Sequence, residues 1–269
     1  MPSPSTPVRR SLAAAAPPDA CATRGDGVVA WSAASAHAGW FAFRLELDRP
    51  PASTAALERA FDLWDGLGHP ADVDRRAVCW ETGLDEPWTP VPARYAPWRH
   101  RGWVRAAGAT LPAAVQGDVR AATASEALRI ARAQAAAEPA LGDAHRAELC
   151  WLYGGLGDRG ADVWAAWAGD RPVAGVLAVP FGADEARLRE LWTAPDHRRR
   201  GLGAALVAAA IAQWPDRRWS LACADGAEAE RIYTRAGFRP ASRFTTASTD
   251  RYSPSRTASP TGPASVTWP

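Results

Sequence analysis

The sequence of 269 residues contains no lysine and no asparagine, although alanine is abundant. Its 31 basic residues are therefore all arginines. The sequence also has 29 acidic residues, which leaves a formal net charge of +2. A balanced charge gives no general attraction to nucleic acid, so we expect no nucleic-acid partner. We attribute the missing lysine to a GC-rich genome, and a single arginine here therefore says little about function.

Long apolar runs and clustered cysteines are also missing. No stretch approaches the roughly 18 apolar residues of a membrane span, so no membrane association is expected. The short apolar segment within Arg9–Pro18 is cut by prolines, which argues against a secretion signal. The four cysteines stand far apart, without Cys-x-x-Cys or Cys/His pairing. This favours a reducing cytoplasm over disulfides, and it predicts no metal site.

Composition divides the chain into four parts. Residues 1–25 and 248–269 are rich in Pro, Ser, Ala or Thr, and we expect both to be disordered. Between them we expect two blocks, 26–110 and 117–247, which part near Ala106–Gly117.

The second block predicts the element order β-α-α-β-β-β-α-β-α-β. Thr123-x-x-Glu126 is a capping box that opens a helix through Ala137. Gly169-Asp170 is a hairpin turn between two strands. The other elements are expected as strands over 118–123, 162–168, 172–180, 185–193 and 219–224, helices after 142 and over 201–214 and 226–236, and closing strands over 238–247.

The first block carries less regular patterns. We expect a strand over 40–47, a helix over 55–66, a strand over 76–81 and an extended segment over 98–111. Seven tryptophans either line a substrate pocket or simply pack in the core; they are Trp31, Trp40, Trp64, Trp80, Trp88, Trp98 and Trp103.

The most informative stretch is Leu188–Leu206, which reads as a strand, a basic loop and a helix start. Within it, Arg198-x-x-Gly201-x-Gly203 places two glycines where the helix begins. A helix start offers unpaired N–H groups, and glycine lets an anion approach them closely. The loop therefore predicts a phosphate site. It lacks the lysine of a P-loop and the glycine spacing of a Rossmann turn.

A second motif follows about 30 residues later, in Ala229-Glu-Arg-Ile-Tyr233-Thr-Arg-Ala-Gly237-Phe238. Together the two motifs resemble the acetyl-CoA signature and the tyrosine helix of the GNAT N-acetyltransferase superfamily. This resemblance covers about residues 117–247. It implies an α/β GNAT fold, in which a mixed, mostly antiparallel sheet is splayed at the cofactor site and flanked by helices. The smaller block before it resembles the degenerate N-terminal half-domain of some actinobacterial members.

The resemblance also implies how acetyl-CoA would be held. Pantetheine would lie between two splayed parallel strands, 188–193 and 219–224, and pair with their backbone groups. The pyrophosphate would lie over the loop amides, with arginines adding charge-assisted bonds. Gly226 stands where the family often has a cofactor-bonding asparagine. The implied cofactor-binding set is Leu191, Trp192, Thr193, Arg198, Arg199, Arg200, Gly201, Leu202, Gly203, Ala204 and Gly226.

Two residues are candidates for the chemistry. Tyr233 occupies the place of the family's general acid, which protonates the departing thiolate; the alternative is that it only packs under the cofactor. Glu190 lies mid-strand beside the gap, and we expect it on the same side as Leu188 and Trp192. It is either the general base or an exposed strand residue paired with a neighbouring arginine.

The resulting hypothesis is a cytoplasmic N-acetyltransferase that moves an acetyl group from acetyl-CoA to a primary amine of a small molecule or peptide. The alternative is a non-catalytic acyl-CoA sensor or scaffold. The sequence leaves open the acceptor, the acyl-chain preference and whether the chain is a monomer or a homodimer.

Overall fold

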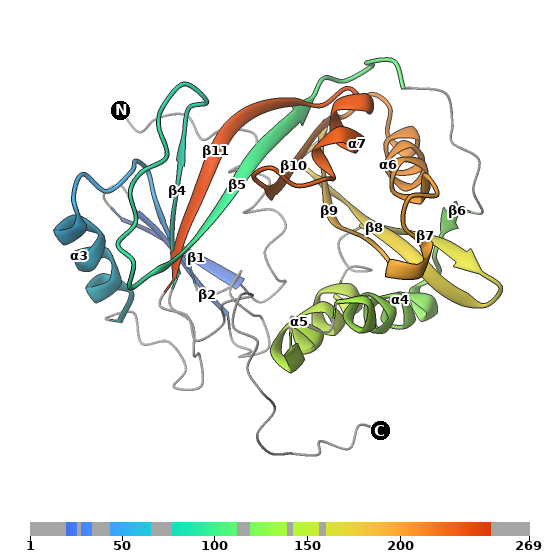
Figure 1. The fold of residues 1–269 in the computed structure, drawn as a ribbon, viewed down its shortest axis with the longest axis horizontal. Coiled ribbons are helices and arrows are strands. Elements are labelled where there is room, and N and C mark those ends of the chain that lie inside the picture. The colour runs from blue at the N-terminus through green and yellow to red at the C-terminus, as the bar shows by residue number, and fades with distance from the viewer. Residues whose placement is uncertain are drawn as a thin grey trace.

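The computed structural model describes residues 20–25, 28–33, 44–65, 77–111, 119–138, 142–155 and 160–248. These residues form one mixed sheet of 11 strands, with helices packed on it (Figure 1). The open, mostly antiparallel sheet with flanking helices is the fold class that the sequence predicts.

The first block supplies five strands and a helix: β1 (Ala20–Gly25), β2 (Val28–Ala33), β3 (Arg44–Leu47), α3 (Thr54–Asp65), β4 (Ala77–Thr82) and β5 (Ala96–Arg105). The expected helix and strands are present, although residues 40–43 lie outside the described residues. The prediction of disorder up to residue 25 is wrong for its last six residues, because β1 pairs antiparallel with β2. Pairing to a sheet edge orders a segment whose own composition does not predict a strand.

The second block supplies β6 (Val119–Ala121), α4 (Ala124–Ala137), α5 (Gly142–Gly154), β7 (Asp162–Ala168), β8 (Arg171–Phe181), β9 (Glu185–Thr193), α6 (Leu202–Gln213), β10 (Arg218–Ala224), α7 (Glu230–Arg235) and β11 (Arg239–Ser248). The predicted element order is confirmed. Two details differ from expectation. Helix α7 begins after position 226, because Gly226 has φ +76, outside the helical region. The closing element is one strand and not several.

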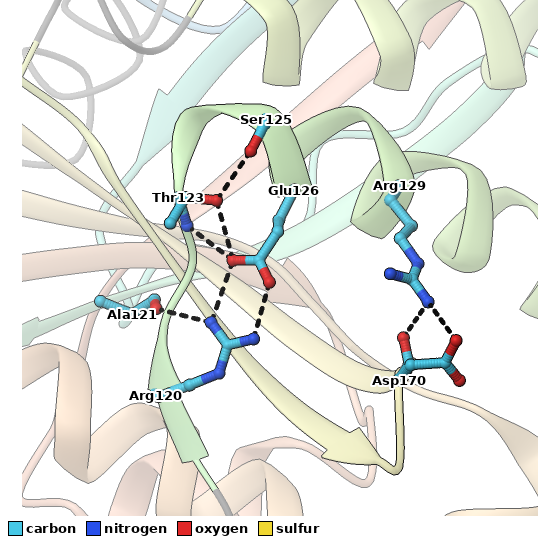
Figure 2. Close-up of polar contacts among 7 residues, drawn as sticks. All are labelled: Arg120, Ala121, Thr123, Ser125, Glu126, Arg129 and Asp170. Carbon is cyan, nitrogen blue, oxygen red and sulfur yellow. Dashed lines mark hydrogen bonds and ion pairs between the residues drawn. The ribbon is translucent and has the colours of Figure 1, made fainter.

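Helix α4 begins at the predicted capping box (Figure 2). The Thr123 backbone N–H donates to Glu126 Oε2 at 2.8 Å, and Arg120 donates to both carboxylate oxygens at 2.9 and 2.6 Å. These bonds lower the pKa of Glu126 to about 2. On the same helix, Arg129 reaches the hairpin turn after β7, where its guanidinium lies 3.2 Å from Asp170 Oδ2.

The sheet mixes the two sequence blocks. Its strand order is β1-β2-β3-β4-β11-β5-β10-β9-β8-β7-β6. Strand β5, from the first block, lies between β10 and β11, and β11, from the end of the chain, lies between β4 and β5. In Figure 1 the green β5 and the red β11 run side by side through the middle of the molecule.

Two apolar cores cover the opposite faces of the second-block strands. One core packs under α6 and α7, and includes Leu188, Leu206, Trp219 and Tyr233. The other packs under α4 and α5, which lie on the opposite side of these strands in Figure 1. A third core joins α3 to β3 and β4. Trp64, Trp80 and Trp103 are buried in these cores, so for them the packing interpretation holds.

Candidate active site

The sheet opens between β9 and β10, its parallel pair in the second block. The two strands pair at Arg218↔Glu185, Trp219↔Ala186 and Ser220↔Arg187, and not beyond. The rest of β9, from Leu188 to Thr193, therefore diverges from Leu221–Ala224. Backbone groups on the facing edges of these segments are left for another extended chain to pair with.

A bulge distorts β9 beside this opening. Against β8, the register jumps from Trp192↔Gly175 to Arg189↔Leu177, so β9 carries one extra residue there. Glu190 lies within the bulge and has φ 52, in the left-handed region that side-chain-bearing residues seldom adopt. The bulge therefore re-aims every side chain that follows it.

The bulge overturns one expectation about Glu190. Leu188 packs in the core under α6, whereas Trp192 packs in the core under α4 and α5, so the two lie on opposite faces. Glu190 accepts a hydrogen bond from Gln134 Nε2 of α4 at 3.2 Å. It therefore shares the α4/α5 face with Trp192 and not the face of Leu188. Simple alternation along a strand fails where an extra residue is inserted.

A polar chain runs from Glu190 into the interior beneath α4 and α5. Tyr153 of α5 donates to Gln134 Oε1 at 2.7 Å, and Gln134 donates to Glu190. Arg189 Nη2 lies 3.5 Å from Glu190 Oε1. Burial raises the pKa of Tyr153 well above its usual value, and the carboxylate of Glu190 adds to this. The neighbouring groups hold the Glu190 carboxylate at the opening, where it is partly exposed.

The predicted phosphate loop is a turn that presents free amides. A short 3-10 segment, Pro195–His197, leads to Arg199 with φ 64 and Gly201 with φ 82. The first backbone bond of α6 runs from Ala205 N–H to the Gly201 carbonyl at 3.0 Å. The N–H groups of Leu202, Gly203 and Ala204 thus precede the helical ladder and can bind an anion.

The loop arginines are exposed, and two of them donate hydrogen bonds to the backbone of the loop itself. Arg198 Nε donates to the Thr193 carbonyl at 3.2 Å, and Arg200 Nη2 donates to the Asp196 carbonyl at 2.9 Å. Asp196 is held in turn by His197 and Arg171, which lower its pKa to about 2. Arg198 and Arg200 therefore fix the loop's shape as well as adding positive charge near its amides.

Gly203 has a packing role that the sequence did not indicate. A Cβ at this position would lie 2.9 Å from Ile232 Cδ1, closer than side chains approach one another. The first turn of α6 therefore lies against α7, the helix that carries Tyr233. The glycine that exposes the loop amides also sets the distance between these two helices.

Tyr233 is buried among aromatic rings beneath α7. Its ring lies 6.3 Å from that of Trp103 and 6.0 Å from that of Phe238, measured between centroids. Burial, with the Cys223 thiol and the Glu190 carboxylate, raises the pKa of Tyr233 well above its usual value. Like an ordinary tyrosine, the phenol is protonated throughout the neutral range and carries the O–H that a donor needs.

Strand β5 completes the site from the first block, which sequence reasoning missed. Arg101 Nη2 lies 2.5 Å from Asp225 Oδ1, and its Nη1 lies 3.6 Å from Glu230 Oε2. Glu230 Oε1 accepts from the Gly226 backbone N–H at 3.0 Å. The buried Arg105 donates to the Ala236 carbonyl at the end of α7. Both ends of the tyrosine helix are thus tied to β5, and the Gly226 amide is already engaged. Only the long-range pairing of β5 would have revealed this.

The opening at the parallel strand pair thus lies beside a helix start whose free amides can bind an anionic group. Among the described residues, no group of three or more His, Cys, Asp or Glu side chains is placed to hold a metal ion. None of the described helices is long and apolar enough to cross a membrane.

Comparison with known families identifies this part of the chain. The family model for the acetyltransferase (GNAT) domain matches residues 159–240. Over these residues the chain carries a GNAT acetyltransferase domain, as the two sequence motifs predict. No curated protein sequence matches the chain.

Solved structures share the fold at low sequence identity. A conserved protein of unknown function from Staphylococcus epidermidis is 10% identical, with a TM-score of 0.68 over 86% of this chain and 94% of that one. A GCN5-related N-acetyltransferase from Kribbella flavida is 19% identical, with a TM-score of 0.51 over 89% and 91%. A tandem GNAT protein from the clavulanic acid biosynthesis pathway is 15% identical, with a TM-score of 0.53 over 94% and 91%. These likenesses extend over both blocks of the chain.

Proposed function

We propose that the chain is an acetyl-CoA-dependent N-acetyltransferase that acts on a primary amine of a small molecule or peptide in the cytoplasm. The observation that carries this proposal is the coincidence of two features. The β9–β10 opening suits an extended, amide-rich pantetheine arm, and the free amides of Leu202–Ala204 at the start of α6 suit its pyrophosphate. Cys79, Cys150 and Cys223 form no disulfide, which fits a reducing compartment.

The backbone of Leu191, Trp192 and Thr193 would pair with the pantetheine arm. The amides from Arg199 to Ala204 would face the phosphates, with the exposed guanidinium groups of Arg198 and Arg200 beside them. Gly226 would contribute less than the asparagine of related enzymes, because Glu230 already occupies its N–H.

The chemistry would use one group from each side of the opening. The amine nitrogen attacks the thioester carbonyl, so that a C–N bond forms and the C–S bond breaks. Glu190 accepts the proton lost by the nitrogen, and Tyr233 donates to the departing sulfur. Glu190 faces α4 and Tyr233 belongs to α7, so the two groups would act from opposite faces of the sheet.

The first block would shape the acceptor side as a degenerate GNAT-like half. Its parallel pair β3–β4, joined through α3, repeats the arrangement of β9, α6 and β10. The β3–β4 pair stays closed from Arg44↔Ala77 to Leu47↔Trp80, over the whole length of β3. We therefore expect no second acetyl-CoA site there. In space, however, each block would contribute one strand to the other: 26–110 would supply β5 to the half formed by 117–247, and 117–247 would supply β11 to the half formed by 26–110.

The decisive experiment is thermal unfolding of the purified chain with acetyl-CoA, CoA or ATP. Ligand at a hundred times its Kd stabilises by about 2.7 kcal/mol, which raises the midpoint by roughly 5–10 °C for a chain of this size. A shift with acetyl-CoA and CoA, but not with ATP, supports the cofactor assignment. No shift with any of them contradicts it.

The alternative function is a non-catalytic acyl-CoA sensor or scaffold. It is favoured by the engaged Gly226 amide, which removes one contact for the cofactor. A sensor predicts the same thermal shift with acetyl-CoA but no release of CoA thiol with any member of an amine panel. An enzyme predicts amine-dependent thiol release, which a thiol-reactive dye would follow continuously.

A further inference from the structure

The α4/α5 face of the opening carries a polar side chain from the first block, His100 of β5. In the sheet register His100 lies opposite Ala224, the last residue of β10, and opposite Phe244 of β11. Directly paired residues point to the same side of a sheet, and neighbours along a strand alternate. Arg101 and Trp103 contact α7 and its core, so His100 faces the other way, toward the side occupied by α4 and α5.

Glu190 and His100 lie at nearly the same level along the sheet. Continuing the β9–β10 register past Ser220↔Arg187 would bring Glu190 level with Cys223, one residue from Ala224. The two side chains are separated only by β10, so their strands lie about 10 Å apart plus the splay. A carboxylate and an imidazole therefore stand on the two strands that flank β10.

The surface between them is made of small side chains. On the α4/α5 face, β10 presents Ala222 and Ala224, and β5 presents Gly102 opposite Ala222. No long side chain from β10 therefore stands between His100 and Glu190. The ring of Trp98, next but one on β5, stacks near His100 with centroids 6.2 Å apart, and this contact orients the imidazole.

Burial and one nearby guanidinium favour the neutral form of the His100 imidazole. Burial and the guanidinium of Arg187, on the same face of β9, lower the pKa of His100 to about 4. Among the described residues, other titratable groups on this face include Arg189 and Glu190 of β9, Tyr153 of α5, Glu81 of β4 and Glu46 of β3. A neutral imidazole offers a lone pair to an N–H donor, which a protonated one does not.

We propose that His100 is an acceptor-binding residue, and that the amine substrate is held between His100 and Glu190 over the floor formed by Gly102, Ala222 and Ala224. This inference rests on the proposed function, since it assumes that the acyl group lies in the β9–β10 opening. It assigns the first block a direct part in recognising the acceptor. The ligand chemistry is an amine nitrogen with at least one N–H donor.

Two CoA thioethers test this inference without knowledge of the acceptor. S-(2-aminoethyl)-CoA places an amine just beyond the sulfur, near the position of an attacking nitrogen, and S-ethyl-CoA has a hydrogen atom in place of that amine. We expect calorimetric titration of the full chain to show at least threefold tighter binding of the aminoethyl compound. In His100→Ala the preference should fall at least threefold while the Kd for S-ethyl-CoA stays unchanged, and His100→Gln, which keeps an acceptor oxygen, should recover part of it.

Arg99→Gln is the matched control, because Arg99 neighbours His100 on β5, points to the opposite face and has an exposed side chain. It should bind both thioethers as the wild type does. Unchanged binding of S-ethyl-CoA also reports that each variant is folded. Equal binding of both compounds by the wild type, or an unaltered preference in His100→Ala, overturns the inference and leaves the proposed function standing. Failure of the wild type to bind S-ethyl-CoA overturns both.

Discussion

At the scale of single residues, the candidate site combines strain with burial. Glu190 holds its carboxylate in the opening only because the β9 bulge places its backbone in the left-handed region. Burial, with a thiol and a carboxylate, raises the pKa of the Tyr233 phenol above its usual value. Both are arrangements that cost stability, and such arrangements concentrate at functional sites.

Comparing glycine and alanine at position 190 separates the backbone strain of this residue from the role of its carboxylate. Glycine adopts φ 52 without penalty, whereas alanine does not, and both substitutions remove the same hydrogen bonds. We expect Glu190→Gly to be more stable than Glu190→Ala by about 1 kcal/mol, measured by urea unfolding. Both variants should lose amine-dependent thiol release. Equal stabilities would show that the bulge relaxes when the carboxylate is removed.

Removing the phenol of Tyr233 tests the acid role. Tyr233→Phe keeps the ring contacts with Trp103 and Phe238, so the fold and acetyl-CoA binding should persist. We expect turnover to fall tenfold or more, because one positioned proton donor contributes on this scale. Stopped assays of thiol release, beside calorimetric titration with acetyl-CoA, measure the two effects separately. A variant with unaltered turnover would leave Tyr233 a packing residue.

His100 predicts a pH dependence of stability. Its pKa falls from 6.5 in the unfolded chain to about 4 in the fold, so the unfolded state binds more protons between these values. Above pH 6.5 His100 therefore does not reduce the free energy of unfolding. As the pH falls from 6.5 toward 4, it reduces this free energy by about 2–3 kcal/mol. We expect His100→Gln to flatten the fall in unfolding free energy over pH 6.5–4, in urea titrations at several pH values. An unchanged slope would contradict the lowered pKa.

At the scale of elements, the contact between α6 and α7 joins the phosphate loop to the tyrosine helix. Gly203 and Ile232 define that contact. The sequence indicated Gly203 only as a place where phosphate approaches the backbone. The structure adds that any side chain there also pushes against α7.

A double substitution tests this contact. Gly203→Ala should destabilise the chain by about 1–3 kcal/mol through overpacking. Ile232→Val removes the Cδ1 atom that a Cβ would meet, and should cost about 0.5 kcal/mol alone. In the pair we expect a favourable coupling of at least about 0.5 kcal/mol, read from thermal or urea unfolding. If the effects of the two substitutions on the free energy of unfolding simply added, the prediction would be contradicted, because α6 and α7 would then move apart at no cost.

Local patterns predicted most elements, and non-local pairing explains what was missed. Strand β9 and the α4 capping box fall at the residues expected, because alternation, turn residues and a cap are written in adjacent positions. The bulge at Glu190 was not foreseen, because no residue in β9 marks an insertion. The close approach of Gly175 on β8 to the indole of Trp192, its partner on β9, was likewise hidden. Of the candidate site, the loop and Tyr233 came from motifs, whereas Arg101 and His100 became visible only once β5 was placed.

At the scale of the whole molecule, the two blocks are parts of one sheet. Strand β5 fills a position in the second block's half, and β11 fills one in the first block's half. The chain therefore divides in sequence near residues 106–117 but does not divide in space at the same place.

Separating the blocks tests this mutual dependence. A fragment of residues 107–269 lacks β5, so β10 loses its antiparallel partner and α7 loses Arg101 and Arg105. We expect the fragment to show no cooperative thermal transition by circular dichroism and no acetyl-CoA-dependent shift. Co-expression with residues 1–106 should restore both. A fragment that unfolds cooperatively by itself would show that β5 is dispensable.

The position of β11 also bears on how the protein is made. In the sheet Arg243 pairs with Thr82, and Ser248 with Ala77. A ribosome releases the first block long before it releases β11, so β4 emerges with one hydrogen-bonding edge uncovered. Contacts of such long sequence separation slow folding, and an open edge invites pairing with other chains. The sheet of the first block would then stay incomplete until the ribosome releases β11. A folding chaperone that covers the open edge of β4 would matter most in that interval.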